Sequence, residues 1–332
     1  MHTSLVFVSR TVRSLAVGAC TTTLVALAAA PAHAAGNYPQ RPITLIVPFG
    51  PGGGVDNVAR RLVQELEGLL PQTVVVENRA GAGSVVGVSA AARSAPDGYT
   101  ILIADPALVI NSLIAEKPQY DYARDFVPVS LVSRAPYILV SSTSLPAGTV
   151  EEIVERSRQG KGLSFASAGV GTAAHMTGEL FRLRTGAQLL HVPYRGGNPA
   201  MTDLAAGQVD MVFTTIASAR PYLDQRRAKP IATTGTERSP EFPELPTLEE
   251  RLKDFQVYFW TALFAPAGTP PEIIKTLEEA VHNALQRDRL KKALAETGNI
   301  PTPLSGEETR AFIEGENSMW KEVIQKTGLK LQ

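Results

Sequence analysis

Pro48-Phe49-Gly50-Pro51-Gly52-Gly53-Gly54-Val55-Asp56 is a glycine-rich turn between the apolar run 43–47 and a helical pattern over 55–70. A second turn, Ser167-Ala168-Gly169-Val170-Gly171-Thr172, follows the apolar run 163–166 and precedes a helical pattern over 173–185. Glycine lets a backbone approach a ligand closely, and the first N–H groups of a helix favour an anion. Either turn alone is typical of a tight strand-to-helix connection. As a pair they predict two helix starts that hold a small acid between them.

Strand and helix patterns alternate from Tyr38 onward, which predicts an α/β fold with parallel, right-handed βαβ units. The first unit has expected strands at 43–47, 74–77 and 100–104. Pro71 is expected to end its first helix. A second α/β unit runs from 163 to about 229. Further strands are expected at 126–132 and 137–141, with a return strand over 255–265 and closing helices over 271–286, 289–297 and 306–326.

The first 34 residues have the pattern of an export signal. Arg10 and Arg13 precede an apolar stretch from Leu15 to Ala30, and Ala32-His33-Ala34 is a small-x-small cleavage pattern. We expect cleavage after Ala34 and a periplasmic product. The alternative is a lipoprotein signal, because Val17-Gly18-Ala19-Cys20 loosely fits a lipobox, although the apolar run before Cys20 is short.

Composition excludes several classes of site. Cys20 is the only cysteine, so cleavage after Ala34 leaves no disulfide, thiolate zinc site or cysteine nucleophile. The signal segment holds two of the 32 basic residues and no acidic one, so the remainder has two more acidic than basic side chains. That balance gives no support for nucleic-acid binding.

The motifs along the chain resemble those of one family, the extracytoplasmic solute receptors of tripartite tricarboxylate transporters, often called Bug proteins. The resemblance covers nearly all of the chain after the signal segment. It rests on eight motifs in order: Tyr38-Pro39-Gln40-Arg41-Pro42-Ile43, Val47 to Asp56, Val76-Glu77-Asn78-Arg79-Ala80-Gly81-Ala82-Gly83, Pro96-Asp97-Gly98-Tyr99-Thr100, Tyr120-Asp121 with Asp125-Phe126-Val127-Pro128-Val129, Gly169-Val170-Gly171-Thr172-Ala173-Ala174-His175, His191-Val192-Pro193-Tyr194-Arg195-Gly196-Gly197 and Ala265-Pro266-Ala267-Gly268-Thr269-Pro270.

The resemblance implies a type II periplasmic-binding-protein fold, in which two α/β lobes joined by a two-segment hinge hold a ligand in the cleft between them. In that family, backbone amides and bridging waters of the first and second glycine turns hold the ligand's carboxylate. The strands at 137–141 and 255–265 are then the crossings between lobes. Lobe 1 is expected at 36–139 plus 263–332 and lobe 2 at 140–262, with the helices after residue 271 packed on lobe 1.

One departure from the family is the short turn Ala104-Asp105-Pro106, where a longer turn rich in Thr, Ser and Asn is common. A carboxylate at Asp105 is unfavourable beside an anionic ligand unless it points away or pairs with an amine of the ligand. The sequence therefore leaves open which carboxylate is bound.

The expected ligand contacts around the first and third glycine loops have structural alternatives. Phe49 could form an apolar wall of the site, beside the backbone of Gly53 and Gly54. Asp56 is predicted to be an N-cap of the first helix, with the shaping of the site as a consequence. Ser84 ends the loop Ala80-Gly81-Ala82-Gly83-Ser84 and is predicted to be an N-cap rather than a ligand group.

Around the second turn, Thr172 is predicted to cap its helix, and the N–H groups of Gly171 and Ala173 are the expected carboxylate donors. Ser167 and Gly169 belong to the same expected contact set. His175, in the first helical turn, could be a neutral donor or a packed histidine, because a helix start disfavours its cation. The remaining candidates are the Tyr194 hydroxyl, which could face the cleft or cover the sheet edge, Thr214 at a strand end, and Arg195, which could pair with the far carboxylate of a ligand or lie in solvent.

Enzymatic alternatives fit the sequence less well. Gly52-Gly53-Gly54 with Glu77 resembles a dinucleotide fingerprint, but Asn57 replaces the third glycine and Asp56 would face the pyrophosphate. The chain has neither a Gly-x-Ser-x-Gly nor a His-Glu-x-x-His motif. We therefore expect a monomeric binding protein with no catalytic residue, no cofactor and no metal. Its partners would be a small carboxylate and the permease subunits of a tripartite tricarboxylate transporter, or a sensor protein.

Overall fold

The computed structural model describes residues 38–330, so the predicted signal segment lies outside the described residues. The strands are β1 (Ile43–Val47), β2 (Val74–Asn78), β3 (Thr100–Ala104), β4 (Phe126–Ser142), β5 (Leu163–Ser167), β6 (Leu189–Pro193), β7 (Met211–Thr215), β8 (Ala228–Thr233), β9 (Tyr258–Pro266) and β10 (Ile300–Leu304). The helices are α1 (Gly54–Leu66), the 3-10 turn η2 (Ala82–Ser84), α2 (Val85–Ala92), α3 (Ala107–Ile114), α4 (Tyr122–Asp125), α5 (Val150–Ser157), α6 (Ala173–Thr185), α7 (Gly197–Ala205), α8 (Ile216–Asp224), α9 (Pro271–Gln286), α10 (Asp288–Ala295) and α11 (Gly306–Thr327).

The first βαβαβ unit is confirmed. β1 pairs in parallel with β2 and β3, and α1 and α2 connect these strands. β1 is buried almost throughout, as a parallel strand covered on both faces should be. The helix α1 ends at Leu66 rather than at Pro71, because the backbone leaves the helical path at Glu67, whose ψ is 126°, and Gly68 follows with a positive φ of 78°.

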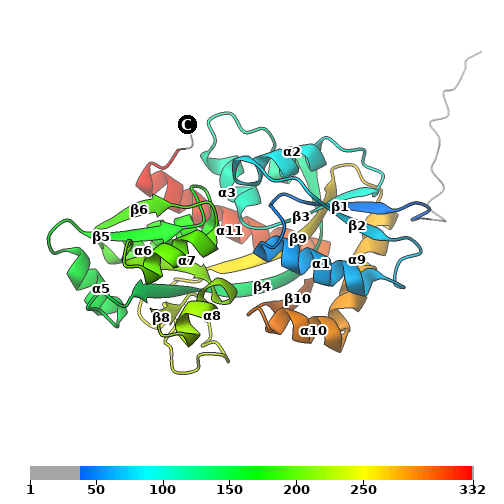
Figure 1. Cartoon of the computed structure of the whole chain (residues 1–332). Coiled ribbons are helices and arrows are strands. Elements are labelled where there is room, and N and C mark those ends of the chain that lie inside the picture. The colour runs from blue at the N-terminus through cyan, green and yellow to red at the C-terminus, as the bar shows by residue number, and fades with distance from the viewer. Residues whose placement is uncertain (1–37, 331–332) are drawn as a thin grey trace, which may run out of the picture. The chain divides into compact units, whose positions relative to one another are not determined.

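One long strand links the two units. β4 was expected as two strands, but it runs unbroken over 17 residues. Its first part pairs with β9, from Phe126 opposite Pro266 to Pro136 opposite Tyr258, and with β10. Its last part pairs with β7 and β8, from Tyr137 opposite Thr215 onward. The sheet order β2-β1-β3-β9-β4-β7-β5-β6 therefore passes through β9 and β4 in the middle of the molecule (Figure 1).

The second unit repeats the arrangement of the first. β5 pairs in parallel with β6 and β7, and α6 and α7 connect them, so each glycine turn again stands at the carboxyl end of a parallel strand. The core includes Phe165, Phe181 and Phe213 from this unit and Trp260 from the central strand β9, all fully buried.

The C-terminal helices take two different positions. α9 and α10 pack against α1, whereas α11 contacts both α3 and α6. The described residues, 38–330, belong to one compact unit, and the expected lobe boundaries fall inside β4 and β9. The division into lobes at 139/140 and 262/263 stays a prediction.

Candidate functional site

The first glycine turn is closed by a buried carboxylate. Asp56 is 1% exposed, and its Oδ2 accepts the Gly52 N–H at 2.8 Å and the Arg60 Nε–H at 2.9 Å. Its Oδ1 accepts from Nδ2 of Asn78 at 2.8 Å. Burial raises the pKa of Asp56, but the hydrogen bonds from Arg60, Gly52 and Asn78 outweigh it, so the pKa lies below its usual value.

Asp56 is therefore not the N-cap that the sequence predicted. The helix starts earlier than expected, so Gly53 occupies the N-cap position and Asp56 lies in the first helical turn. From there the side chain reaches back to the turn, in front of the N-cap. The Asp56 carboxylate therefore holds the turn in shape and places a negative charge at the start of α1. That charge offsets the attraction of this helix end for another anion.

The first turn lies against an aromatic ring from β9. Gly54 is exposed, and a Cβ added to it would stand 3.3 Å from Cζ of Phe259 in β9. The ring of Phe259 packs edge-on against Tyr137 in β4, with 6.3 Å between centroids. Phe49 is half-buried and packs on the core, while its carbonyl accepts from Asn78. Phe259 was not a sequence candidate, because its place beside Gly54 depends on the pairing of β9.

The second glycine turn is held by its own side chains. Thr172 is the N-cap of α6, as predicted, and its Oγ1 accepts from the His175 N–H at 3.3 Å while donating to the Gly169 carbonyl at 2.7 Å. Ser167 is fully buried, and its Oγ bonds to both the N–H and the carbonyl of Gly169. Ser167 therefore supports the turn.

The N–H of Gly171 is not free, contrary to the expectation that it serves the ligand. It points to Nδ1 of His175 at 3.3 Å. Nδ1 of His175 consequently accepts, and the histidine does not act as a donor through this atom. Ala173 and Ala174 are the first residues of α6, where helical N–H groups have no acceptor within the helix. The expected donor Ala173 thus remains, with Ala174 beside it.

Two stacked histidines lie beneath the second turn. The rings of His175 and His191 are 3.8 Å apart with an interplanar angle of 19°, and Phe165 stacks on the pair. Nε2 of His191 hydrogen-bonds with Oγ of Ser167 at 2.7 Å. Burial, with the neighbouring His191, lowers the pKa of His175 to about 3, and burial lowers that of His191 to about 4. Both rings are neutral near pH 7, which makes His175 a packed histidine.

The third glycine loop meets the second through Asn111, which the sequence did not single out. Nδ2 of Asn111 donates to the Gly83 carbonyl at 2.6 Å and lies 3.4 Å from Oγ of Ser84. Ser84 occupies the N-cap position of α2, but its side chain caps nothing and its φ is 90°. The predicted capping role of Ser84 is wrong, because the left-handed backbone turns its hydroxyl towards Asn111. The sequence signal for Asn111 was one amide within the apolar helix Ala107–Ile114.

Three other candidates have positions of their own. The hydroxyl of Tyr194 donates to Oδ2 of Asp203 at 2.6 Å, which ties β6 to α7 and leaves the ring on the core. Thr214 is 4% exposed, and its Oγ1 would stand 3.1 Å from a Cβ at Gly197, the first residue of α7. Arg195 is exposed.

Asp105 lies between the end of β3 and Pro106, the N-cap of α3. Its Oδ1 accepts from the Ala107 N–H at 3.0 Å. Burial raises the pKa of Asp105 to about 7, although hydrogen bonds from the Ala107 and Asp105 N–H groups oppose this. A carboxyl group that is partly protonated near neutral pH repels an anion less than a fully charged one.

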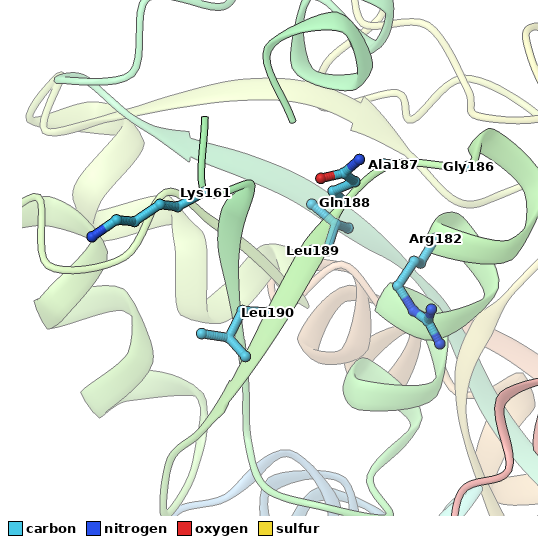
Figure 2. A pocket seen from close by; sticks show the side chains of 7 residues that line it. All are labelled: Lys161, Arg182, Gly186, Ala187, Gln188, Leu189 and Leu190. Atoms are coloured by element: carbon cyan, nitrogen blue, oxygen red, sulfur yellow. The ribbon is translucent and has the colours of Figure 1, made fainter. Parts of the chain in front are cut away.

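A surface hollow of about 390 Å³ lies at the other end of the second unit. It is lined by Lys161, Arg182, Gly186, Ala187, Gln188, Leu189 and Leu190. Figure 2 shows the side chains of Lys161 and Arg182 on either side of the two leucines. These residues surround the beginning of β6, whereas the glycine turn follows the end of β5, so the hollow contains no predicted site residue. Among residues 38–330 no group of His, Cys, Asp and Glu is arranged to hold a metal, and no helix is both long and apolar enough to span a bilayer.

Comparison with known proteins gives the arrangement a family context. The family model described as tripartite tricarboxylate transporter family receptor matches residues 58–329. Protein BugT of Bordetella pertussis is 38% identical over 303 residues, 90% of this chain and 93% of BugT. The R. palustris protein Rpa4515, solved with adipate, has a TM-score of 0.81 and 32% identity, covering 88% of this chain and 99% of that one. MatC (Rpa3494) from Rhodopseudomonas palustris, with bound malate, has a TM-score of 0.77 and 32% identity, covering 86% and 100%.

These similarities confirm the expected fold, since the solved neighbours are two-lobed α/β periplasmic binding proteins. The matched family is one of solute-binding receptors and not of enzymes, as the sequence motifs predicted. Its members are periplasmic binding proteins.

Proposed function

Because the chain belongs to the tripartite tricarboxylate transporter receptor family, we propose that it captures a small carboxylate in the periplasm and delivers it to a membrane transporter of that type. The ligand class comprises dicarboxylates and tricarboxylates, acidic amino acids and aromatic acids. Rpa4515 was solved with adipate and MatC with malate, and both ligands are dicarboxylates. Dicarboxylates are therefore the first compounds to test.

The start of α6 is the observation that carries this proposal. The first turn of α6 has no acidic residue, and its histidine is neutral near pH 7, so the positive end of the helix dipole is uncompensated. The first turn of α1 instead contains Asp56, whose charge already occupies that end. We infer that the ligand's carboxylate binds the N–H groups of Ala173 and Ala174, and that the turn at Gly53 and Gly54 contributes the opposite wall with Phe49.

The strength of such a site is compatible with a transport receptor. Hydrogen bonds to a charged group contribute about 1.5–3 kcal/mol each, and micromolar affinity requires about 8 kcal/mol in total. A few backbone N–H groups and bridging waters therefore suffice after the costs of association. Backbone donors recognise the carboxylate without reading the rest of the molecule, so selectivity must come from the surrounding side chains.

A ligand screen tests the proposal. Purified protein is mixed with dicarboxylates, tricarboxylates, acidic amino acids and aromatic acids, and the melting temperature is measured, because a ligand that binds only the folded state raises it. The best compound is then incubated with the protein, with and without nicotinamide cofactor, and examined by NMR. We expect a rise in melting temperature and recovery of the ligand unchanged. A protein-dependent product, or no shift with any carboxylate, would contradict the proposal.

Location and partner have separate tests. Intact mass of protein from a periplasmic extract should correspond to cleavage after Ala34, and a full-length or Cys20-acylated species would contradict the predicted signal. Genes for one large and one small membrane subunit beside this gene would support delivery to a transporter, and a neighbouring sensor gene would support the alternative partner.

A further inference from the structure

Asn111 is a buried polar group in an apolar helix. It is 3% exposed, and its neighbours Leu108, Val109 and Ile110 in α3 are fully buried. A buried amide is costly unless it is hydrogen-bonded. Its Nδ2 bonds to the Gly83 carbonyl at 2.6 Å and lies 3.4 Å from Oγ of Ser84. Because a carbonyl only accepts, these bonds fix which end of the amide faces the third glycine loop.

The other end of the amide faces the second glycine turn. A Cβ added to Gly171 would stand 2.6 Å from Oδ1 of Asn111 and 3.0 Å from Cδ1 of Ile114. The φ of Gly171 is +77°, so both its backbone conformation and this close approach to α3 require glycine. The two glycine loops therefore meet on the same side chain, one by hydrogen bonds and the other by direct packing.

The residues in contact come from both predicted lobes. Gly83, Ser84 and Asn111 lie within 36–139, and Gly171 lies within 140–262. Gly171 immediately precedes the N-cap Thr172 of α6, whose first N–H groups form the proposed carboxylate site. A contact at this point joins the proposed site to the opposite lobe without occupying the N–H groups that the ligand needs.

We propose that Asn111 is a positioning residue that holds the second and third glycine loops together and so stabilises the closed form of the ligand site. The inference rests on the proposed function for its affinity readout only. In a receptor that opens and closes, the apparent affinity contains the free energy of closing, which is the same for every ligand that binds the closed form. A contact that acts through closure therefore changes the affinity for all ligands by one common factor, whereas a ligand contact changes their ranking.

The first test compares Asn111→Ala and Asn111→Leu with the wild-type protein. The leucine keeps the approximate size of the side chain and adds no charge, but it removes the N–H that bonds to the Gly83 carbonyl. We expect each variant to weaken the binding of all carboxylates that bind the wild type by about tenfold, with their ranking unchanged. Titration calorimetry measures the affinities. Unchanged affinities in a folded variant, or a changed ranking, would overturn the proposal.

The second test needs no ligand and separates this inference from the proposed function. Spin labels are placed at the exposed positions Lys117 and Arg156, one in each predicted lobe, in a Cys20→Ser background. We expect wild-type protein to show a population at the label separation of this structure, and Asn111→Ala to lose most of it. If no carboxylate binds but this population is lost, the proposed function fails and the role of Asn111 stands. A wild type without that population, or a variant that retains it, overturns the role of Asn111.

A matched pair of glycine variants tests the Gly171 side of the contact with Asn111. Gly171→Ala introduces a Cβ against Asn111, whereas Gly160→Ala places one at a similar positive φ of 67° with nothing within 4 Å. The two share backbone strain, so their difference reports the packing against α3. Only Gly171→Ala is expected to reduce the closed population. An equal effect of both variants would contradict the proposal.

Discussion

Trp260 and Trp320 donate their indole N–H groups to the same atom, Oε2 of Glu316, at 3.4 and 3.0 Å. Trp260 belongs to the central strand β9, and Trp320 belongs to α11, which contacts both α3 and α6. They are the only tryptophans of the chain, and both are fully buried. Burial raises the pKa of Glu316 to about 7, although both indoles oppose this by stabilising the carboxylate. Tryptophan fluorescence should therefore report the protonation of Glu316.

The first prediction concerns Glu316 and stability. The folded protein keeps the proton up to about pH 7, whereas the unfolded chain releases it near the ordinary pKa of 4.5. The stabilising contribution is thus complete below pH 4.5 and is lost as the pH rises through 7. A glutamine does not titrate, so Glu316→Gln should remove this loss. The free energy of unfolding of the variant minus that of the wild type should therefore be larger at pH 8 than at pH 5, by about 2 kcal/mol. Urea unfolding at both pH values measures it, and equal effects would contradict the raised pKa.

The histidine stack should give the opposite slope. His175 and His191 have lowered pKa values of about 3 and 4, so they stay neutral in the folded protein while the unfolded chain takes up protons below pH 6.5. The free energy of unfolding should fall as the pH drops from 6.5 towards 4. His191→Phe keeps an aromatic ring and should make this decline shallower. Urea unfolding between pH 4 and pH 6.5 measures the slope, and an unchanged slope in His191→Phe would contradict the lowered pKa values.

Asp56 should be more important for stability than an ordinary helix-start acid. Asp56→Ala removes one buried carboxylate and leaves the Gly52 N–H, the Arg60 side chain and Nδ2 of Asn78 without that acceptor. We expect a loss of about 3 kcal/mol in the free energy of unfolding. The neighbouring Asn57→Ala, at an exposed side chain with one long bond to the Gly52 carbonyl, should cost less than about 1 kcal/mol. Similar costs for both would show that the Asp56 bonds are weak.

Proline substitution can remove a single proposed ligand donor. Ala173 is the first helical residue of α6, a position that favours proline, and Thr172 before it has the extended backbone that proline requires. Ala173→Pro should preserve α6 and weaken carboxylate binding by about tenfold or more, which calorimetry measures. Asp288→Pro is the control, since it deletes the equivalent N–H at the exposed start of α10. Undiminished affinity in folded Ala173→Pro would exclude that N–H as a donor.

Local chemistry explains which parts of the site could be predicted from the sequence. The strand, glycine turn and helix around Thr172 follow from residues close together in the chain, and the predicted cap is present. The predictions for Asp56 and Ser84 were wrong for two local reasons: one helix began earlier than its apolar pattern, and one residue adopted a left-handed backbone.

The remaining features depend on distant pairing. Phe259 reaches Gly54 only because β9 returns between β3 and β4, and Asn111 meets Gly171 only after the two units have come together. A phenylalanine is ordinary in a core strand and an asparagine is not rare in a helix. Hydrophobic periodicity alone therefore could not mark Phe259 or Asn111 as site residues. The hydrogen bond from the Gly171 N–H to Nδ1 of His175 likewise depends on the orientation of the histidine ring, which the sequence does not give.

The shared strand β4 also has a consequence for how the chain matures. β3 and the first part of β4 acquire their common partner β9 only after residues 143–257 have been synthesised. Until then two strands with buried, apolar side chains have unpaired edges, and such edges are templates for aggregation. A nascent chain released early, or a fragment cut at residue 139 or 140, would therefore keep these edges unpaired and depend on a chaperone. The full-length chain pairs them with its own strand β9 once that strand has been synthesised.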